Sequence, residues 1–188
     1  MTIVKVGVLA LQGDFREHVR ILEAMGATPS EVRTVDDLAD VQALVIPGGE
    51  STTIGKLAHA YGLVEPVRAR IAEGMPVLGT CAGMIVLAVR VHGGEPLFGG
   101  LDVTVRRNAY GRQVDSFESA LAIRGIEHRV RGVFIRAPWI EEIGPEVDVL
   151  ASLEGHPVVL EQRNLVAASF HPELVGETGL HEYFLRKV

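Results

Sequence analysis

The chain has 188 residues, of which 47% are hydrophobic and 22% charged, and its formal net charge is −6 at pH 7. This length and balance predict one globular domain, residues 1–188, with a single sizeable core. The acidic charge argues against nucleic acid as a partner, and no apolar run approaches the roughly 20 residues of a membrane span. The N-terminal segment lacks the features of a secretion signal, and the single cysteine suits a reducing compartment. We therefore expect a cytoplasmic protein with no membrane association.

Strand-like and helix-like patterns alternate through the first half of the chain. Three apolar runs predict strands that are buried on both faces, and each is followed by apolar residues at helical spacing. This alternation predicts a three-layer, doubly wound α/β fold with a mostly parallel sheet, in which ligands bind at the carboxyl ends of the strands. The predicted strands cover 3–11, 42–49 and 75–79, and the predicted helices cover 15–25, 51–62 and 82–91.

The second half is richer in strand patterns and ends in a helical one. We expect its strands to extend the core sheet as antiparallel additions, and we expect a closing helix over 178–188. The predicted strands cover 101–107, 132–138, 147–153, 156–162 and 165–170.

The only cysteine lies in the turn Gly79-Thr80-Cys81-Ala82-Gly83, between a predicted strand and a predicted helix. This G-x-C-x-G pattern is the thiol counterpart of a nucleophile elbow, which projects the sulfur above the sheet and places it at a helix N-terminus, where thiolate is favoured. The N–H of Ala82 could then stabilise an oxyanion. The alternative is a small buried side chain, the usual fate of a free cysteine. The glycine on each side favours the nucleophile.

A nucleophilic cysteine needs a base, and "SFHPEL" offers His171 with Glu173 two residues later. In an extended segment, which Pro172 helps to hold, both side chains leave the same face, so Glu173 can orient the imidazole as in a catalytic triad. The alternative is an ordinary surface turn after a strand.

A glycine turn follows the second predicted strand, at Pro47-Gly48-Gly49-Glu50-Ser51. Gly48 or Gly49 could supply a second oxyanion donor, and Glu50 could pair with a substrate ammonium. The alternative is a simple strand-to-helix turn with Ser51 as the helix cap. Zinc-ligand spacing, G-x-G-x-x-G and Walker A patterns are all missing from the sequence, so we expect no metal and no cofactor.

Cysteine elbow, glycine turn and His-x-Glu, in their order along the chain, resemble the class I glutamine amidotransferases, a family with a flavodoxin-like fold. Within that family the chain is similar to the glutaminase subunits of pyridoxal 5'-phosphate synthases. The blocks that carry this resemblance run from residue 7 to 173: "GVLALQGDFREH", "PGGESTT", "GTCAG", "RNAYGRQVDSFE", "FIRAP" and "SFHPEL".

The resemblance implies hydrolysis of L-glutamine to L-glutamate and ammonia, with Cys81 as nucleophile and His171 and Glu173 completing the triad. It also implies that ammonia passes to a (β/α)8-barrel synthase subunit, in a complex of twelve copies of each chain. The segment Gln12–Gly13 and the helix with Glu17 and His18 would face that partner. The glutamine contacts would be Gly49, Glu50, Ser51, Arg107, Ile135 and Arg136.

Three alternatives stay open at this stage. Arg107, Arg112 and Arg136 could make ordinary surface ion pairs. The chain could be a glutaminase or another cysteine hydrolase that serves a different pathway. It could also be a binding module whose cysteine is inert, which a failure to release ammonia would indicate.

Overall fold

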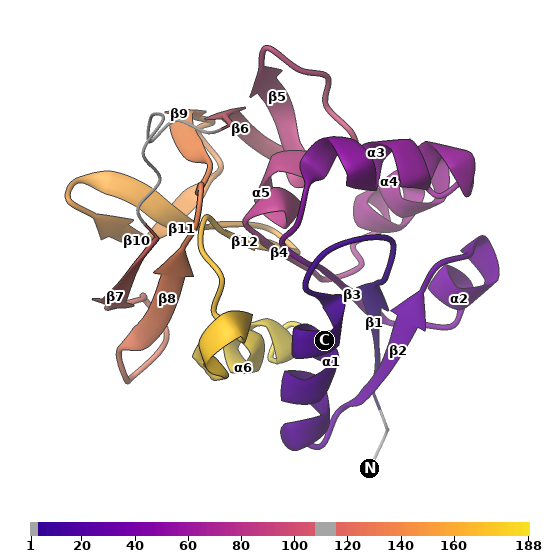
Figure 1. Cartoon of the computed structure of the whole chain (residues 1–188), viewed down its shortest axis with the longest axis horizontal. Coiled ribbons are helices and arrows are strands. Elements are labelled where there is room, and N and C mark those ends of the chain that lie inside the picture. Colours follow the sequence, from indigo (N-terminus) through magenta and orange to yellow (C-terminus); the bar gives the residue numbers. More distant parts are fainter. Residues whose placement is uncertain (1–3, 108–115) are drawn as a thin grey trace.

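The structure, a computed structural model, describes residues 4–107 and 116–188 of the chain. Its main sheet has seven strands: β1 (Lys5–Leu9), β2 (Thr28–Val32), β3 (Ala43–Ile46), β4 (Val77–Thr80), β10 (Asp148–Leu153), β11 (His156–Gln162) and β12 (Leu165–Ala168). They lie in the order β10-β11-β12-β4-β3-β1-β2 (Figure 1). All pairs from β12 to β2 are parallel, and β11 is antiparallel to both of its neighbours. The predicted, mostly parallel sheet is therefore confirmed.

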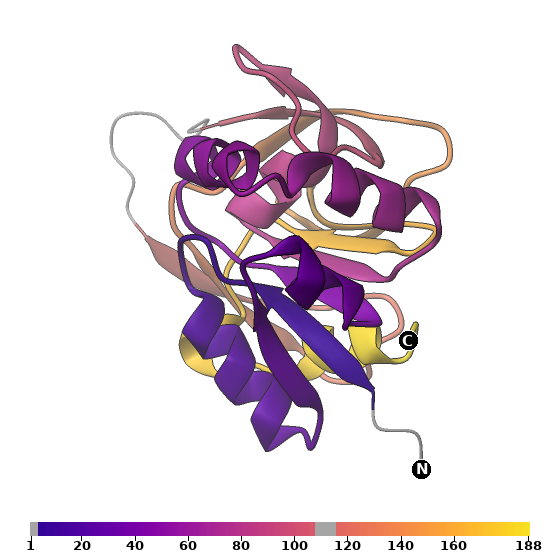
Figure 2. The same ribbon diagram turned by 90° about the vertical axis from the view of Figure 1, so that its right-hand side faces the viewer.

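Helices cover both faces of this sheet, which confirms the three layers. Helices α1 (Phe15–Ala24) and α6 (Gly179–Leu185) lie on one face, and α3 (Ser51–Ala60), α4 (Val64–Ala72) and α5 (Ala82–Leu87) on the other (Figure 2). Successive side chains of each strand point to opposite faces of the sheet and so pack against both helical layers. In β3, for example, Val45 packs with Leu22 of α1, whereas Leu44 and Ile46 belong to the cluster of α3 and α4.

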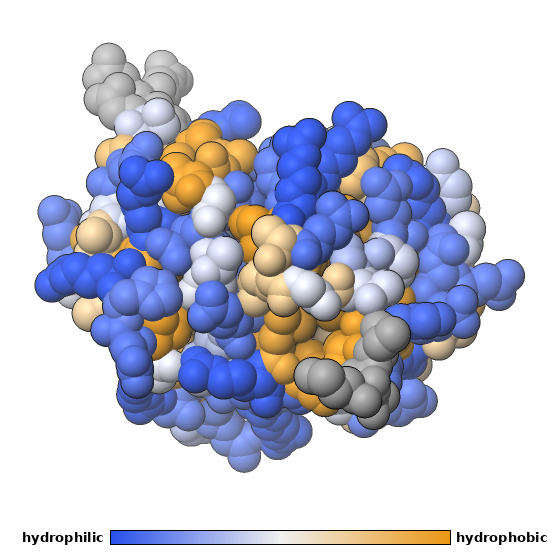
Figure 3. Space-filling model, turned by 90° about the horizontal axis from the view of Figure 1, so that it is seen from below, coloured by the Kyte–Doolittle hydropathy of each residue, from blue (hydrophilic) through white to orange (hydrophobic). Residues whose placement is uncertain are grey.

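The underside of the molecule, below α1 and α6, is mostly hydrophilic (Figure 3). Apolar areas on this surface are smaller and lie between charged side chains. The surface is mostly hydrophilic because the apolar sides of both helices are buried against the sheet. Among the described residues, none of the helices combines the length and apolarity that crossing a membrane requires.

Two smaller sheets correct the expected arrangement of the second half. One contains β5 (Ala88–His92), β6 (Leu101–Arg106) and β9 (Trp139–Ile143), and the other contains β7 (Phe117–Leu121) and β8 (Val130–Phe134). The runs 101–107 and 132–138 therefore do not extend the core sheet, whereas 147–153, 156–162 and 165–170 do. The expected antiparallel pairing with the core is wrong for 165–170, because β12 pairs in parallel with β4. The alternating burial of β6 suits a strand with one covered face, which sequence cannot assign to a particular sheet.

The predicted helix at 82–91 is wrong beyond residue 87. Helix α5 ends at Leu87, and Ala88 begins β5, which pairs in parallel with β6. A short apolar run is compatible with either state, and here pairing with β6 decides for the strand. The sequence patterns also missed five elements. Two of them, the strand β2 and the short helix α2 (Val35–Ala39), follow one another along the chain, and the others are α4, β7 and β9.

The carboxyl ends of β1, β3, β4 and β12 meet at one edge of the main sheet. Strand β1 lies between β2 and β3, so the chain reverses its direction of progress across the sheet at this point. Such a switch point leaves a crevice at the strand ends, where ligands bind in open α/β sheets. The segments that follow β3, β4 and β12 carry the glycine turn, Cys81 and the His171–Glu173 pair, whereas Arg107, Ile135 and Arg136 follow β6 and β8 of the smaller sheets.

Candidate active site

Cys81 lies in a strained turn between β4 and α5. Its backbone has φ 50° and ψ −105°, a conformation that non-glycine residues rarely adopt, and its N–H donates to the carbonyl of Ala168 at 2.8 Å. The neighbouring glycines are required by close packing. A Cβ on Gly79 would lie 2.7 Å from the carbonyl carbon of Gly83, and a Cβ on Gly83 would lie 2.1 Å from the carbonyl oxygen of Ile46. The elbow geometry predicted from the two glycines is present.

Gly83→Ala is expected to lower the free energy of unfolding by about 3 kcal/mol, because the new methyl group collides with the rigid backbone of β3. Thermal unfolding should show a Tm lower by roughly 6 to 12 °C. Gly55→Ala is the matched control. Gly55 lies within helix α3, and a Cβ there would meet the side chain of Leu97 at an ordinary 3.7 Å. That variant should be as stable as the parent or slightly more so. Equal Tm values for the two variants would contradict the packing argument.

His171 and Glu173 form a buried pair beside the elbow. His171 is 6% and Glu173 4% exposed, and the Nδ1 atom of the imidazole lies 2.7 Å from Oε1 of the carboxylate. The backbone of His171 exchanges two hydrogen bonds with Val133 of β8, at 2.8 and 3.2 Å. With Nδ1 engaged by Glu173, the other ring nitrogen of His171 can interact with the thiol of Cys81, and this interaction raises the pKa of the imidazole.

The expectation that the His-Pro-Glu segment is extended is wrong, although the predicted contact between His171 and Glu173 is present. Pro172 has φ −70° and ψ −29°, and Glu173 begins the 3-10 helix η1 (Glu173–Val175). An extended chain would hold the two side chains roughly parallel and two residues apart. The turn brings them into direct contact instead.

Burial and neighbouring charges act against each other on the pKa of both groups. Burial alone lowers the pKa of His171, but Asp14, Cys81 and Glu173 together raise it well above its ordinary value. Burial raises the pKa of Glu173, but interactions with His18 and His171 bring it well below its ordinary value. The pair is therefore arranged as an imidazolium beside a carboxylate, which holds the ring in one orientation.

Asp14 is a second carboxylate at the imidazole, and sequence analysis missed it. Its Oδ2 atom lies 3.3 Å from Nδ1 of His171, and it precedes α1 without making a side-chain cap. Asp14, His171 and Glu173 each offer one possible metal-ligand atom within 4.8 Å of the others. The 2.7 Å hydrogen bond already engages the imidazole nitrogen of this set, so the cluster fits acid–base chemistry directly.

Asp14→Asn is expected to lower the pKa of His171, because it removes one of the negative charges that stabilise the imidazolium. An NMR titration of the imidazole should show proton loss about one pH unit lower than in the parent. Asp36→Asn, in the exposed first turn of α2, is the control and should leave that titration unchanged. Identical titrations for all three proteins would show that Asp14 does not affect the pKa of His171.

The segment that follows β1 is hydrogen-bonded to the glycine turn that follows β3. The N–H of Asp14 donates to the carbonyl of Gly48 at 2.9 Å, and the N–H of Glu50 donates to Oε1 of Gln12 at 2.7 Å. Gly48 lies directly against the imidazole, since a Cβ there would be 2.2 Å from Cε1 of His171. The glycine turn and the triad candidates therefore share one small volume.

Glu50, and not Ser51, is the cap of helix α3. Its carboxylate accepts hydrogen bonds from the N–H groups of Thr52 at 3.0 Å and Thr53 at 2.7 Å, and from both threonine hydroxyls. These bonds from Thr52 and Thr53 lower the pKa of Glu50 to about 2. The side chain is therefore a fixed anion at the edge of the site. Ser51 is the first residue of the helix.

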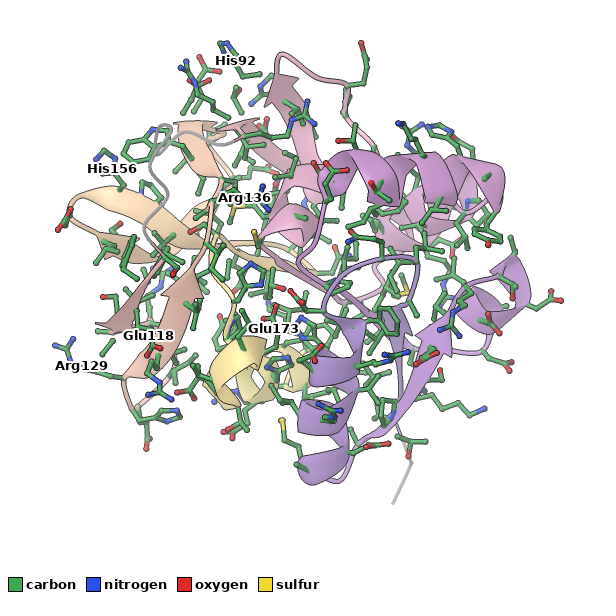
Figure 4. The ribbon with its side chains drawn as sticks, viewed as in Figure 1. His92, Glu118, Arg129, Arg136, His156 and Glu173 are labelled. Carbon is green, nitrogen blue, oxygen red and sulfur yellow. The ribbon has the colours of Figure 1, made fainter. Side chains whose placement is uncertain are left out.

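A cavity of about 440 Å³ opens above the cysteine and brings most of the predicted site residues together. Figure 4 shows Arg136 at the end of β8 and Glu173 near α1 and α6, whereas His92 and His156 lie at the rim of the molecule. The cavity is lined by Gly49, Glu50, Ser51, Cys81, Arg107, Ile135, Arg136 and His171, together with Gln12, Asp14, Thr52, Ile85 and Leu174.

Three predicted site residues are not part of the cavity lining. Gly48 and Glu173 lie beneath it, and Ala82 is the first residue of α5, where a backbone N–H precedes any intrahelical acceptor. Of "RNAYGRQ", only Arg107 belongs to the described residues, so Arg112 lies outside them. The carbonyl of Ile135 approaches Sγ of Cys81 to 4.0 Å, and Arg136 follows with φ 43°.

Solved structures with the same architecture are glutamine amidotransferases. One crystal structure of a glutamine amidotransferase has a TM-score of 0.92 and 50% sequence identity, over 97% of each chain. The structure of PurLQS from Thermotoga maritima has a TM-score of 0.75 over 99% of each chain, and its 17% identity limits that likeness to the fold. The fold, with a cysteine elbow at the carboxyl end of β4, is that of the class I amidotransferases.

The chain belongs to the SNO glutamine amidotransferase family, which matches residues 8–188. It is 53% identical to the pyridoxal 5'-phosphate synthase subunit PdxT of Mycolicibacterium vanbaalenii, over 98% of each chain. It is 54% identical to the subunit of the same name from Parafrankia sp., over 100% of this chain and 95% of that relative.

Proposed function

We propose that this chain hydrolyses L-glutamine to L-glutamate and ammonia as the glutaminase subunit of a pyridoxal 5'-phosphate synthase. The observation that carries the proposal is the contact of His171 with Glu173 at 2.7 Å beside a cysteine on a strained elbow. The assignment to this synthase is supported by relatives that are named as its subunits. They are more than half identical to this chain over nearly its whole length.

The proposed reaction is acyl transfer through a thioester. The thiolate of Cys81 attacks the side-chain amide carbon of glutamine, and the carbonyl oxygen becomes an oxyanion. When this intermediate collapses, the C–N bond breaks, the imidazolium of His171 gives its proton to the leaving nitrogen, and ammonia departs. Water then gives a proton to the imidazole and attacks the thioester, which releases glutamate and restores the thiolate. Glu173 holds the imidazole in place through both steps.

The cavity residues suit an amino-acid substrate. We assign the oxyanion donors to the N–H groups of Ala82 and of the Gly48–Gly49 turn. The fixed anion of Glu50 suits the α-ammonium, and the guanidinium groups of Arg107 and Arg136 suit the α-carboxylate. Gly49, Ser51 and Ile135 complete the glutamine site with backbone groups and packing.

The proposed partner is a synthase subunit with a (β/α)8 barrel, in a complex of twelve copies of each chain. Ammonia would pass to it directly, and the lone cysteine makes the cytoplasm the compartment we propose. The face that carries Gln12 and Gly13 is the proposed docking surface, because this segment holds the glycine turn by two hydrogen bonds. Docking there can act on the oxyanion donors.

The test is glutamate and ammonia release from L-glutamine, with the purified chain alone and with a pyridoxal 5'-phosphate synthase subunit added. We expect release that the partner increases strongly. Asparagine in place of glutamine is the substrate control and should be inert. Absence of release under both conditions would overturn the proposed function and leave a binding module.

A further inference from the structure

Two buried histidines lie next to the triad candidates and approach Glu173 and Thr80. His18 comes from α1 and His181 from α6, and neither side chain is exposed to solvent. Nδ1 of His18 lies 2.8 Å from Nε2 of His181, with the ring centroids 5.0 Å apart. The side chain of His18 therefore takes no part in the surface that α1 offers to solvent. It points into the protein.

The other nitrogen of His18 faces the carboxylate that orients the active-site imidazole. Nε2 of His18 lies 3.6 Å from Oε1 of Glu173 and 3.2 Å from the hydroxyl of Thr80, the residue before Cys81. Oε1 is also the atom that His171 contacts at 2.7 Å. Oε2 accepts no hydrogen bond from the described part of the chain. The two imidazoles thus act on one oxygen of Glu173.

Hydrogen-bond chemistry fixes which nitrogen of His18 carries a proton. If His18 is neutral, Nδ1 accepts from Nε2–H of His181 and the ring proton lies on Nε2. If His18 is an imidazolium, Nδ1–H donates to His181 and Nε2 is again protonated. A bare Nε2 could accept only from the hydroxyl of Thr80, and its lone pair would lie 3.6 Å from the buried carboxylate oxygen of Glu173, which is unfavourable. In both favourable arrangements an N–H of His18 faces Glu173.

We propose that His18 is a positioning residue of the active site: His181 holds its ring through Nδ1, its Nε2–H faces Glu173, and this anchors the carboxylate and so keeps His171 directed at Cys81. The groups that face His18 come from three other elements: Thr80 of β4, Glu173 of η1 and His181 of α6. The low pKa of Glu173 agrees with this, since burial alone would raise it and interactions with His18 lower it. A residue that only filled space there would need neither nitrogen.

Two substitutions separate the two nitrogens of His18. In His18→Asn the amide can replace Nδ1 and keep a partner for His181, but it cannot reach Glu173. In His18→Gln the longer amide can replace Nε2 and donate to Glu173. Leu22→Ala is the structural control, because Leu22 is a buried residue of the same helix that packs in the core below the site.

The first readout is alkylation of Cys81 by iodoacetamide, followed by mass spectrometry. Cys81 is the only cysteine, so every adduct reports this thiol, and no substrate or partner is needed. We expect His18→Asn to slow alkylation at neutral pH by roughly 10-fold, a loss typical of removing an outer group that orients a functional residue. His18→Gln should recover most of the rate. Leu22→Ala should lower Tm and leave the rate unchanged.

The second readout is glutamine turnover with the synthase subunit present, and this part rests on the proposed function. His18→Asn should lower kcat by roughly 10- to 100-fold with little change in KM, whereas His18→Gln should stay within a few fold of the parent. Parent rates of both alkylation and turnover in His18→Asn would overturn the inference, as would equal losses in His18→Asn, His18→Gln and Leu22→Ala. If the parent releases no ammonia but alkylation still depends on His18, the proposed function fails and the positioning role stands.

Discussion

Cys81→Ala is expected to reduce glutamate release from L-glutamine by at least about 10⁴-fold, because the variant has no sulfur with which to form the thioester. The loss should appear in kcat, whether or not the synthase subunit is present. Binding of glutamine should survive, since the cavity keeps Glu50, Arg107 and Arg136. Coupled glutamate detection gives the rate, and calorimetric titration with glutamine gives the binding.

The fold should tolerate this change. Cys81 is 6% exposed, and alanine removes one atom without adding volume to the crowded turn. Tm should therefore fall by only a few degrees, in contrast to the clash expected at Gly83. Turnover at the parent rate in a folded Cys81→Ala protein would show that another group attacks the amide.

His171→Asn is expected to lower turnover nearly as far, by about 10³- to 10⁴-fold, because members of a triad act as a unit. Asparagine is close in size to the ring but cannot take and return a proton in the relevant pH range. The pH dependence that the imidazole imposes should disappear with it. Rates measured from pH 7 to 12, the range in which the raised pKa of His171 places its proton loss, should show no such dependence in the residual activity.

His59→Asn is the matched control, since His59 lies exposed in the last turn of α3 and outside the cavity. It should retain the parent rate and the parent pH profile. The double variant with Cys81→Ala and His171→Asn should be no slower than Cys81→Ala alone. An additive loss would mean that His171 acts independently of the thiol.

The parts of this structure that sequence could predict are those written in local patterns. Runs such as "ALVI" in β3 are buried on both faces, so their apolar continuity predicts a central parallel strand. Gly79 and Gly83 flank Cys81 because backbone approaches within 3 Å leave no room for a Cβ, and this need is visible as spacing. The core of the site was predictable for that reason.

The rest depends on contacts between distant segments, which leave no local pattern. Asp14 reaches His171 across 157 positions of sequence, and His18 meets His181 across 163. Nothing in either neighbourhood distinguishes these side chains from a surface aspartate or a core histidine. Helix α5 and strand β5 share one apolar run, so their boundary at Ala88 is set by the strand that pairs there.

The paired hydrogen bonds between Val133 and His171 have a consequence for thermal inactivation. They join the main sheet to the two-stranded sheet of β7 and β8, and a hairpin of this size has little stability of its own. Beyond the bridge, Phe134 packs on Phe170 with ring centroids 5.2 Å apart. Local opening of β8 would release the backbone of His171 while the parallel sheet stays folded. On warming, the chain should therefore lose activity before it loses secondary structure, and cooling should restore it.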